Sequence, residues 1–271
     1  MVPGCGCRPK VGIPHAGDLV SLAHPLELEM RVQLFGTCLI DTMFPETGEA
    51  TVRLLRHFGV EVRYPEGQTC CGKPADSGGY SSASRKAAEH FISVFEGSDD
   101  PIVIPSGSCA SMVKNHYPEL FKDDGRMLQK AEAIAARTFE LSQFLVNVLK
   151  IHEANLSGKG KITYHASCQL TRELGVREEP LLLLQSLKGV EFVPLPYADR
   201  CCGFGGIFMA KLPEVSMALA DEKLDTILAT GADTVTGCDH GCLMNIADAV
   251  KRRGSTVQVK HIASVLAECL R

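Results

Sequence analysis

The 271-residue chain has no long apolar run and no large excess of charge of either sign. Its longest stretch without a charged residue runs from Pro101 to Val113, and these 13 positions fall short of the roughly 18 that a membrane-spanning helix needs. Lys and Arg number 28 against 32 Asp and Glu, a net charge of -4, and no block of five or six like charges occurs. These absences exclude a transmembrane segment and argue against a nucleic-acid partner.

Common redox and targeting motifs are also missing. The run C-x2-C-x2-C-x3-C-P of bacterial ferredoxins is absent. No flavin or nicotinamide fingerprint is visible, since the glycines of Gly203–Gly206 lack the required spacing. The first 29 residues carry only two basic side chains, and their most apolar stretch is interrupted, which does not favour a secretory signal. We therefore expect a cytoplasmic protein with reduced thiols, which exchanges electrons with another polypeptide if it acts in a relay.

Cysteine is the residue type that stands out, with 12 copies arranged as a repeat. The first half contains Cys38, then Cys70-Cys71-Gly72, then Cys109, and the second half contains Cys168, then Cys201-Cys202-Gly203, then Cys238 and Cys242. The offsets between corresponding cysteines are 130, 131 and 133 positions. This constancy indicates two tandem copies of one unit.

The ends of the two copies also match. The segment 139–149 resembles 260–270, which predicts a terminal helix in each copy, and the polar stretch 153–161 between them suits a domain boundary. The opening segment is rich in Pro and Gly and has no counterpart in the second copy, so we interpret it as a tail or a misassigned start upstream of Met30. The predicted organisation is a tail at 1–29, a first domain at 30–152 and a second domain at 161–271.

Apolar periodicity predicts that strands and helices alternate in both copies. The predicted strands are 31–36, 60–64, 102–104, 162–165, 190–195 and 233–236, and the predicted helices include one that begins at Pro45 and ends near Gly59, one around 87–95, one around 181–187 and one over 213–229. The fold class is therefore α/β, with two tandem repeats of a small parallel-sheet unit. Every cysteine group follows a predicted strand. The cysteine loops should thus meet at the carboxyl edge of the strands, where ligands bind.

The cysteine pattern is compatible with more than one metal. Cys238 and Cys242 are close to zinc-ligand spacing, but two adjacent cysteines such as Cys201 and Cys202 reach one tetrahedral ion awkwardly. A cluster with several irons offers neighbouring thiolates different metal atoms, so four or five cysteines in each copy favour an iron-sulfur cluster. Zinc, purely structural cysteines and a disulfide framework remain open alternatives at this point.

The motifs FGTCLID, TCCG, PSGSCA, YHASC and RCCGFGG resemble the cysteine-rich CCG domain family. Two copies of this domain occur in the heterodisulfide reductase B subunit, the glycolate oxidase iron-sulfur subunit and the anaerobic glycerol-3-phosphate dehydrogenase C subunit. The motifs of the stand-alone A proteins of lactate utilisation resemble these most. The resemblance covers Arg31 to Arg271 and implies 4Fe-4S clusters in an oxidoreductase complex.

Carried over by position, the resemblance implies cofactor and metal ligands in both copies: Cys38, Cys70, Cys71, Cys109, Cys168, Cys201, Cys202, Cys238 and Cys242. The second copy carries the full five-cysteine motif and could hold a non-cubane cluster. The first copy has Pro105 and Ser106 where a fifth cysteine would lie, so only an ordinary cluster is expected there. His165 and His240 lie close to cysteines and could donate a hydrogen bond to a cluster or move a proton, or could be ordinary loop histidines.

Three functions follow from these observations. The resemblance favours an iron-sulfur electron-transfer subunit, without a flavin of its own, in a complex that oxidises L-lactate or a related 2-hydroxy acid to pyruvate. Its partners would be the other subunits of that complex, including a ferredoxin-like iron-sulfur protein. The alternatives are a thiol-disulfide reductase subunit like that of heterodisulfide reductase and a zinc-stabilised scaffold protein.

Overall fold

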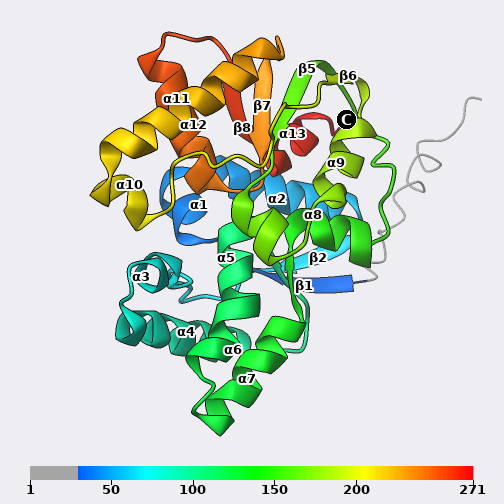
Figure 1. Cartoon of the computed structure of the whole chain (residues 1–271). Coiled ribbons are helices and arrows are strands. Elements are labelled where there is room, and N and C mark those ends of the chain that lie inside the picture. Colours follow the sequence, from blue (N-terminus) through cyan, green and yellow to red (C-terminus); the bar gives the residue numbers. More distant parts are fainter. Residues whose placement is uncertain (1–29, 271) are drawn as a thin grey trace, which may run out of the picture.

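The computed structural model describes residues 30–270, and each repeat forms a four-stranded parallel sheet (Figure 1). The first sheet has the order β2-β1-β3-β4 and contains β1 (Met30–Leu34), β2 (Val60–Arg63), β3 (Ile102–Ile104) and β4 (Thr138–Glu140). The second has the order β6-β5-β7-β8 and contains β5 (Ser157–His165), β6 (Lys188–Phe192), β7 (Thr234–Gly237) and β8 (Gln258–His261). The prediction of two parallel α/β units is confirmed.

Helices connect the strands and cover the sheets (Figure 1). Those of the first repeat are α1 (Cys38–Met43), α2 (Pro45–His57), α3 (Lys73–Ser77), α4 (Ser81–Phe95), α5 (Gly107–Ser111), the π-helical turn η1 (Met112–His116), α6 (Tyr117–Leu120), α7 (Gly125–Ala136), α8 (Leu141–Gln143) and the π-helical turn η2 (Phe144–Val148). Those of the second are the π-helical turn η3 (Gln169–Glu173), α9 (Glu178–Gln185), α10 (Ile207–Lys211), α11 (Pro213–Ala229), α12 (His240–Arg252) and α13 (Ile262–Glu268).

The long helices begin and end where the sequence signals lie. Pro45 occupies the first turn of α2, and Gly59 follows the end of that helix with a positive φ of 77°. Thr51, Leu54 and Leu55 form its buried face. In the same way Pro213 is the first residue of α11. Proline at the first helical position and glycine after the last turn are therefore reliable boundaries in this chain.

The terminal segments 139–149 and 260–270 differ from the prediction, because each begins as a strand. Residues 138–140 form β4 and residues 258–261 form β8, so each sheet gains a fourth strand. The helices start only at Leu141 and Ile262, after Glu140 and His261 cap them: Glu140 Oε2 accepts from Ser142 N at 2.8 Å, and His261 Nδ1 accepts from Ala263 N at 3.2 Å. Glu and His are uncommon N-caps, which explains why the sequence pattern did not reveal the boundary.

Not all of the predicted domain boundaries fall within residues 30–270, which the structure describes. The tail at 1–29 lies outside the described residues. The polar stretch 153–161 contains the start of β5 at Ser157. Within residues 30–270, no helix is both long and apolar enough to cross a membrane.

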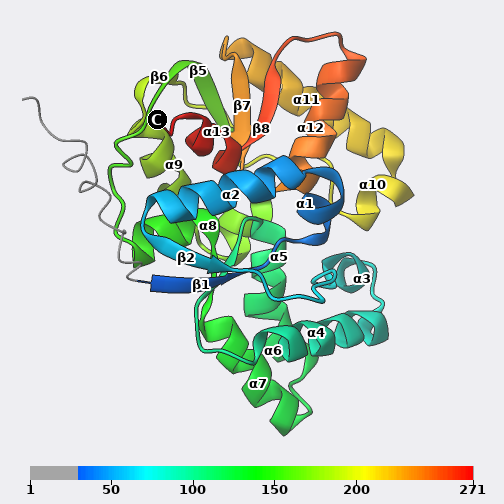
Figure 2. The same ribbon diagram turned by 180° about the vertical axis from the view of Figure 1, so that it is seen from behind.

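The two repeats share one buried apolar cluster, and each repeat also has a cluster of its own. Helix α2 lies between the first sheet and the second repeat in both views (Figures 1 and 2) and packs against α13. Its counterpart in the second repeat, α9, packs against η2, which is the counterpart of α13 in the first repeat. Leu55 of α2 and Leu266 of α13 belong to the same buried cluster. These reciprocal contacts give the molecule the pattern of a two-fold dimer built from one chain.

We predict that the two repeats unfold together, because their core is common to both. Leu54 has no exposed surface, so Leu54→Ala should lower the free energy of unfolding by about 2 to 5 kcal/mol. Arg53→Ala, an exposed change on the same helix, should alter it by less than about 0.5 kcal/mol. Urea denaturation followed by circular dichroism and by tyrosine fluorescence measures both values. Two separate transitions would contradict a shared core.

Candidate metal centre

The cysteines lie at the carboxyl edges of both sheets, as the sequence predicts. Cys38 follows β1 and Cys109 follows β3, and these neighbouring strands flank the point where the strand order reverses. Cys168 follows β5 and Cys242 lies beyond β7, at the same point of the second sheet. Loops that leave such a point in opposite directions open a crevice for ligands. The doubled cysteines come from the loops after β2 and β6, the next strands in each sheet.

In the first repeat the four thiols form a chain of hydrogen bonds. Cys70 contacts Cys38 and Cys71, and Cys71 contacts Cys109. Hydrogen bonds from Cys38 and Cys71 lower the pKa of Cys70 to about 2, whereas the contact with Cys70 raises the pKa of Cys38. The set therefore stabilises a thiolate at Cys70 and keeps the neighbouring thiol of Cys38 protonated. A thiolate is the form of cysteine that binds metal.

In the second repeat Cys168, Cys201, Cys202 and Cys242 form the matching set. The Cys202 thiol is hydrogen-bonded to both Cys201 and Cys242. The contact with Cys202, followed by burial, raises the pKa of Cys201, and burial raises that of Cys168. Metal binding to these thiols would release protons, so affinity should rise with pH.

Glycine makes the turn after each cysteine pair possible. Gly72 and Gly203 have φ values of 88° and 84°, a backbone region that other residues rarely adopt. A Cβ on Gly203 would lie 2.3 Å from the carbonyl oxygen of Ser216, so no side chain fits there. The turn aims each glycine N–H at the first cysteine of the pair, at 3.4 Å from Cys70 Sγ and 3.3 Å from Cys201 Sγ. Such N–H groups stabilise negative charge on the sulfur.

A buried donor also holds the carbonyl group of the second cysteine in each pair. Tyr117 Oη donates to the Cys71 oxygen at 2.9 Å, and Asn245 Nδ2 donates to the Cys202 oxygen at 2.7 Å. The two donors differ in chemical type but act on the same atom of the motif. Both cysteine pairs are therefore fixed in position by their repeat before any metal binds.

The two sets of cysteines face one cavity of about 230 Å³. Its walls contain eight of the nine predicted ligands: Cys38, Cys70, Cys71, Cys109, Cys168, Cys201, Cys202 and Cys242. The loops after β3 and β7 join the two halves directly. Ser108 N donates to Asp239 Oδ2 at 2.7 Å, and Gly107 N donates to the Cys238 oxygen at 3.1 Å. The reciprocal packing of the repeats thus places two sites next to each other.

Cys238 is the predicted ligand that the structure does not bring to the cavity. Its side chain is fully buried in the shared apolar core, and its Sγ lies 3.6 Å from Tyr164 Oη. Burial raises the pKa of this thiol well above its usual value. The position equivalent to Cys238 in the first repeat is Pro105. The two repeats therefore present four cysteines each to the cavity, although their sequences suggest four and five.

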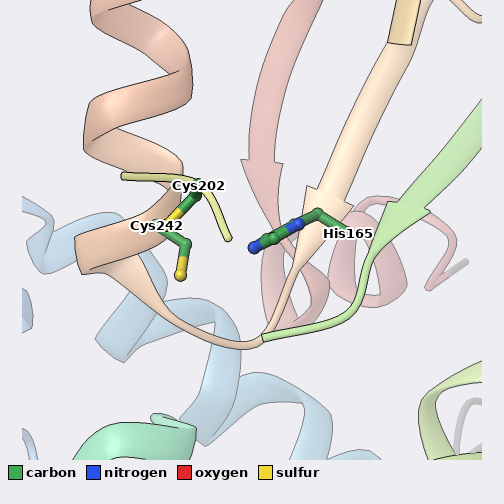
Figure 3. Close-up of side chains that lie close together, drawn as sticks. All are labelled: His165, Cys202 and Cys242. Atoms are coloured by element: carbon green, nitrogen blue, oxygen red, sulfur yellow. The ribbon is translucent and has the colours of Figure 1, made fainter. Parts of the chain in front are cut away.

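Two histidines also reach this region, both beside cysteines of the second repeat. His165, at the end of β5, points toward Cys202 and Cys242, and the ligand atoms of these three residues lie within 4.8 Å of one another (Figure 3). His240 lines the cavity, bonds Thr47 Oγ1 through Nε2 at 3.2 Å and stacks on His261 at 4.8 Å between ring centroids. His261 was not predicted to lie at the site, since it is distant from every cavity cysteine along the chain.

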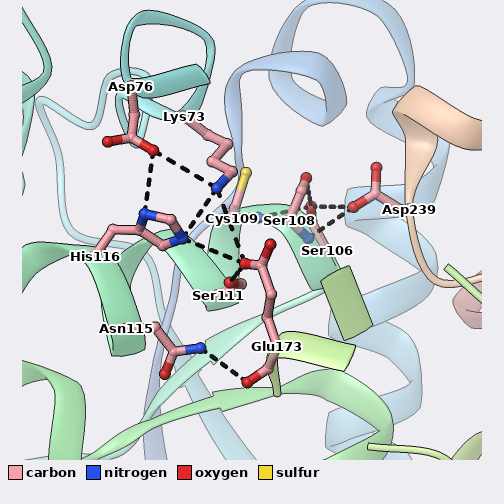
Figure 4. A network of polar contacts seen from close by, with 10 residues as sticks. All are labelled: Lys73, Asp76, Ser106, Ser108, Cys109, Ser111, Asn115, His116, Glu173 and Asp239. Atoms are coloured by element: carbon pink, nitrogen blue, oxygen red, sulfur yellow. Dashed lines mark hydrogen bonds and ion pairs between the residues drawn. The ribbon is translucent and has the colours of Figure 1, made fainter. Parts of the chain in front are cut away.

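A network of charged residues joins the repeats beside the cavity (Figure 4). Lys73, which also lines the cavity, lies 3.0 Å from His116 Nε2, 3.6 Å from Asp76 and 3.9 Å from Glu173. Glu173 belongs to the second repeat and accepts a hydrogen bond from Ser111 of the first. The members of this network come from three separate segments of the chain, so no sequence pattern reveals it. Its role in the structure is to link η3 to the first repeat.

The residues present fit a sulfur-bound metal group. Each set provides four thiols, and none of the ten cysteines within residues 30–270 forms a disulfide. Four cysteines are the ligand set of a 4Fe-4S cluster and also of a structural zinc site. A cavity of about 230 Å³ has the volume of several water molecules, which is more than a single ion requires. The donor chemistry and the space together favour a cluster.

A known protein family matches both copies of the repeat. The profile of the cysteine-rich domain, CCG, matches residues 32–114 and 162–247. "Lactate utilization protein A" from Geobacillus sp. (strain WCH70) is 48% identical over 237 residues, which cover 88% of this chain and 99% of that protein. The protein of the same name from Exiguobacterium sp. (strain ATCC BAA-1283 / AT1b) is 49% identical over 88% of this chain and 97% of its own length.

A third relative, "Lactate utilization protein A 2" from Bacillus cereus (strain Q1), is 47% identical over 89% of this chain and 99% of its own. Among solved structures, an aspartate racemase homologue from Pyrococcus horikoshii OT3 covers 88% of the chain at 12% identity with a TM-score of 0.32, too low to support an inference. Each matched segment contains residues of three strands of one sheet with their cysteine loops, while β4 and β8 lie beyond the matched residues. The chain therefore belongs to the cysteine-rich CCG domain family, of which it contains two tandem copies.

Proposed function

We propose that this chain is an iron-sulfur electron-transfer subunit of a complex that oxidises L-lactate or a related 2-hydroxy acid to pyruvate. The convergence of eight cysteines on one cavity is the observation that carries the proposal. The names of relatives that are 47 to 49% identical over nearly their whole length supply the metabolic context. When bound, each 4Fe-4S cluster would accept and release one electron at a time.

The chain's own residues would hold and tune these groups. The eight cavity cysteines would be the ligands, and the N–H groups of Gly72 and Gly203 would donate to bound sulfur. Such hydrogen bonds raise the reduction potential of a cluster because they stabilise its more negative, reduced state. Tyr117 and Asn245 would keep the paired cysteines in place while the charge changes.

Two sites in one cavity suit the stoichiometry of the proposed reaction. Oxidation of a 2-hydroxy acid to a 2-oxo acid releases two electrons and two protons. Because the chain has no flavin or nicotinamide motif, the hydroxy acid would be oxidised on another subunit, and the two sites here would take the electrons one each. A ferredoxin-like iron-sulfur protein would be the next partner. We place this complex in the cytoplasm, where free thiols persist.

We predict that protein purified without oxygen is brown and contains iron and acid-labile sulfide in equal amounts. Cys202→Ser should remove about half of the iron, since it disables one four-cysteine set, and Cys71→Ser should do the same for the other. Cys269→Ser is the matched control, because Cys269 is buried but lies outside the cavity. Iron and sulfide assays with visible absorption measure the outcome. A colourless protein with stoichiometric zinc would instead support the scaffold alternative.

The loop after β7 allows a test of the number of ligands. We predict that Cys242→Ala loses the second site, whereas Cys238→Ala keeps full iron, since only Cys242 lines the cavity. Cys238→Ala should cost about 1 kcal/mol of stability through loss of its packing in the core. Iron content and the electron paramagnetic resonance (EPR) spectrum of each variant decide. Equal loss of iron in both variants would show that Cys238 turns into the site and completes a five-cysteine set.

A further inference from the structure

His165 differs from the other buried histidines at the site, because neither of its ring nitrogens makes a hydrogen bond of normal geometry within residues 30–270, although the Ala198 backbone lies close to the ring. Its side chain is 1% exposed. By contrast, His240 bonds Thr47, and His261 caps α13 through Nδ1. An unpaired polar group in a protein interior is costly, so a buried ring of this kind calls for a ligand.

The surroundings of His165 suit metal binding. Its ring points at Cys202 and Cys242, two of the four thiols of the second set (Figure 3). The ligand atoms of these three residues lie within 4.8 Å of one another, close enough to contact one bound metal group together.

The first repeat has no equivalent donor. The residue three positions before its first cysteine is Phe35, where the second repeat has His165. Phe35 packs edge-on against Phe91 and Phe95, with ring centroids 4.9 and 5.9 Å away. The same backbone position therefore supports an aromatic core in one repeat and directs a nitrogen at the cysteines in the other.

We infer that His165 is a nitrogen ligand of the metal group held by the second cysteine set, alongside Cys202 and Cys242. This inference rests on the proposed iron-sulfur function. The imidazole would be a further donor beside the four thiolates, so the second site would differ from the first in its ligand set.

Pulsed EPR of the reduced full-length protein tests this assignment. Wild type should show the coupling of one histidine nitrogen to the cluster, and labelling of histidine with nitrogen-15 should change it. The coupling should vanish in His165→Phe, which copies the first repeat, and persist in His240→Phe, which alters a buried histidine that lines the cavity, as His165 does not. If His165→Phe binds too little metal, His165→Asn is measured in its place.

Iron and sulfide assays on the same samples separate this inference from the proposed function. Wild type without iron would overturn both. Wild type with full iron but no histidine coupling, or a coupling that survives in His165→Phe, would overturn only the role of His165. Loss of the coupling in His165→Phe with the iron content retained would support it.

Discussion

The packing of α2 against α13, and of α9 against η2, is the contact on which the site depends. Each repeat alone has a sheet edge with four cysteines, but one face of its helices would remain apolar and uncovered. Leu54 and Leu55 of α2 are fully buried and belong to the apolar cluster that both repeats share. The same contact turns the carboxyl edges of the two sheets toward one cavity. Stability and the proximity of the two sites thus have a common origin in this buried apolar surface.

Gathering eight thiols in one cavity creates an electrostatic problem that the backbone partly solves. Thiolates repel one another and lose solvation on burial, so free thiols there remain largely protonated. The glycine turns place one N–H group beside the first cysteine of each pair, and thiol-to-thiol hydrogen bonds favour a thiolate at Cys70. A bound cation would relieve the remaining repulsion. The motif is therefore arranged for a ligand that brings positive charge.

The repeats have diverged around this common arrangement. Tyr117 and Asn245 perform the same task with different groups, whereas Phe35 and His165 perform different tasks from the same position. The charged network of Lys73, His116 and Glu173 lies on only one side of the pseudo-two-fold arrangement. Such differences give the two cysteine sets unequal surroundings, although their cysteines correspond.

The sequence by itself determined the α/β class, the duplication and the approximate positions of most strands. These depend on local periodicity, on Pro45 and Pro213 at helix starts, and on glycines with positive φ, all of which are visible over a few residues. Constant offsets also identified the cysteine sets. Only the tertiary structure decided that the sets share a cavity, that Cys238 faces Tyr164 instead, and that the ring of His165 lies beside Cys202 and Cys242. Those outcomes depend on side-chain direction and on packing between distant segments, which no short-range pattern encodes.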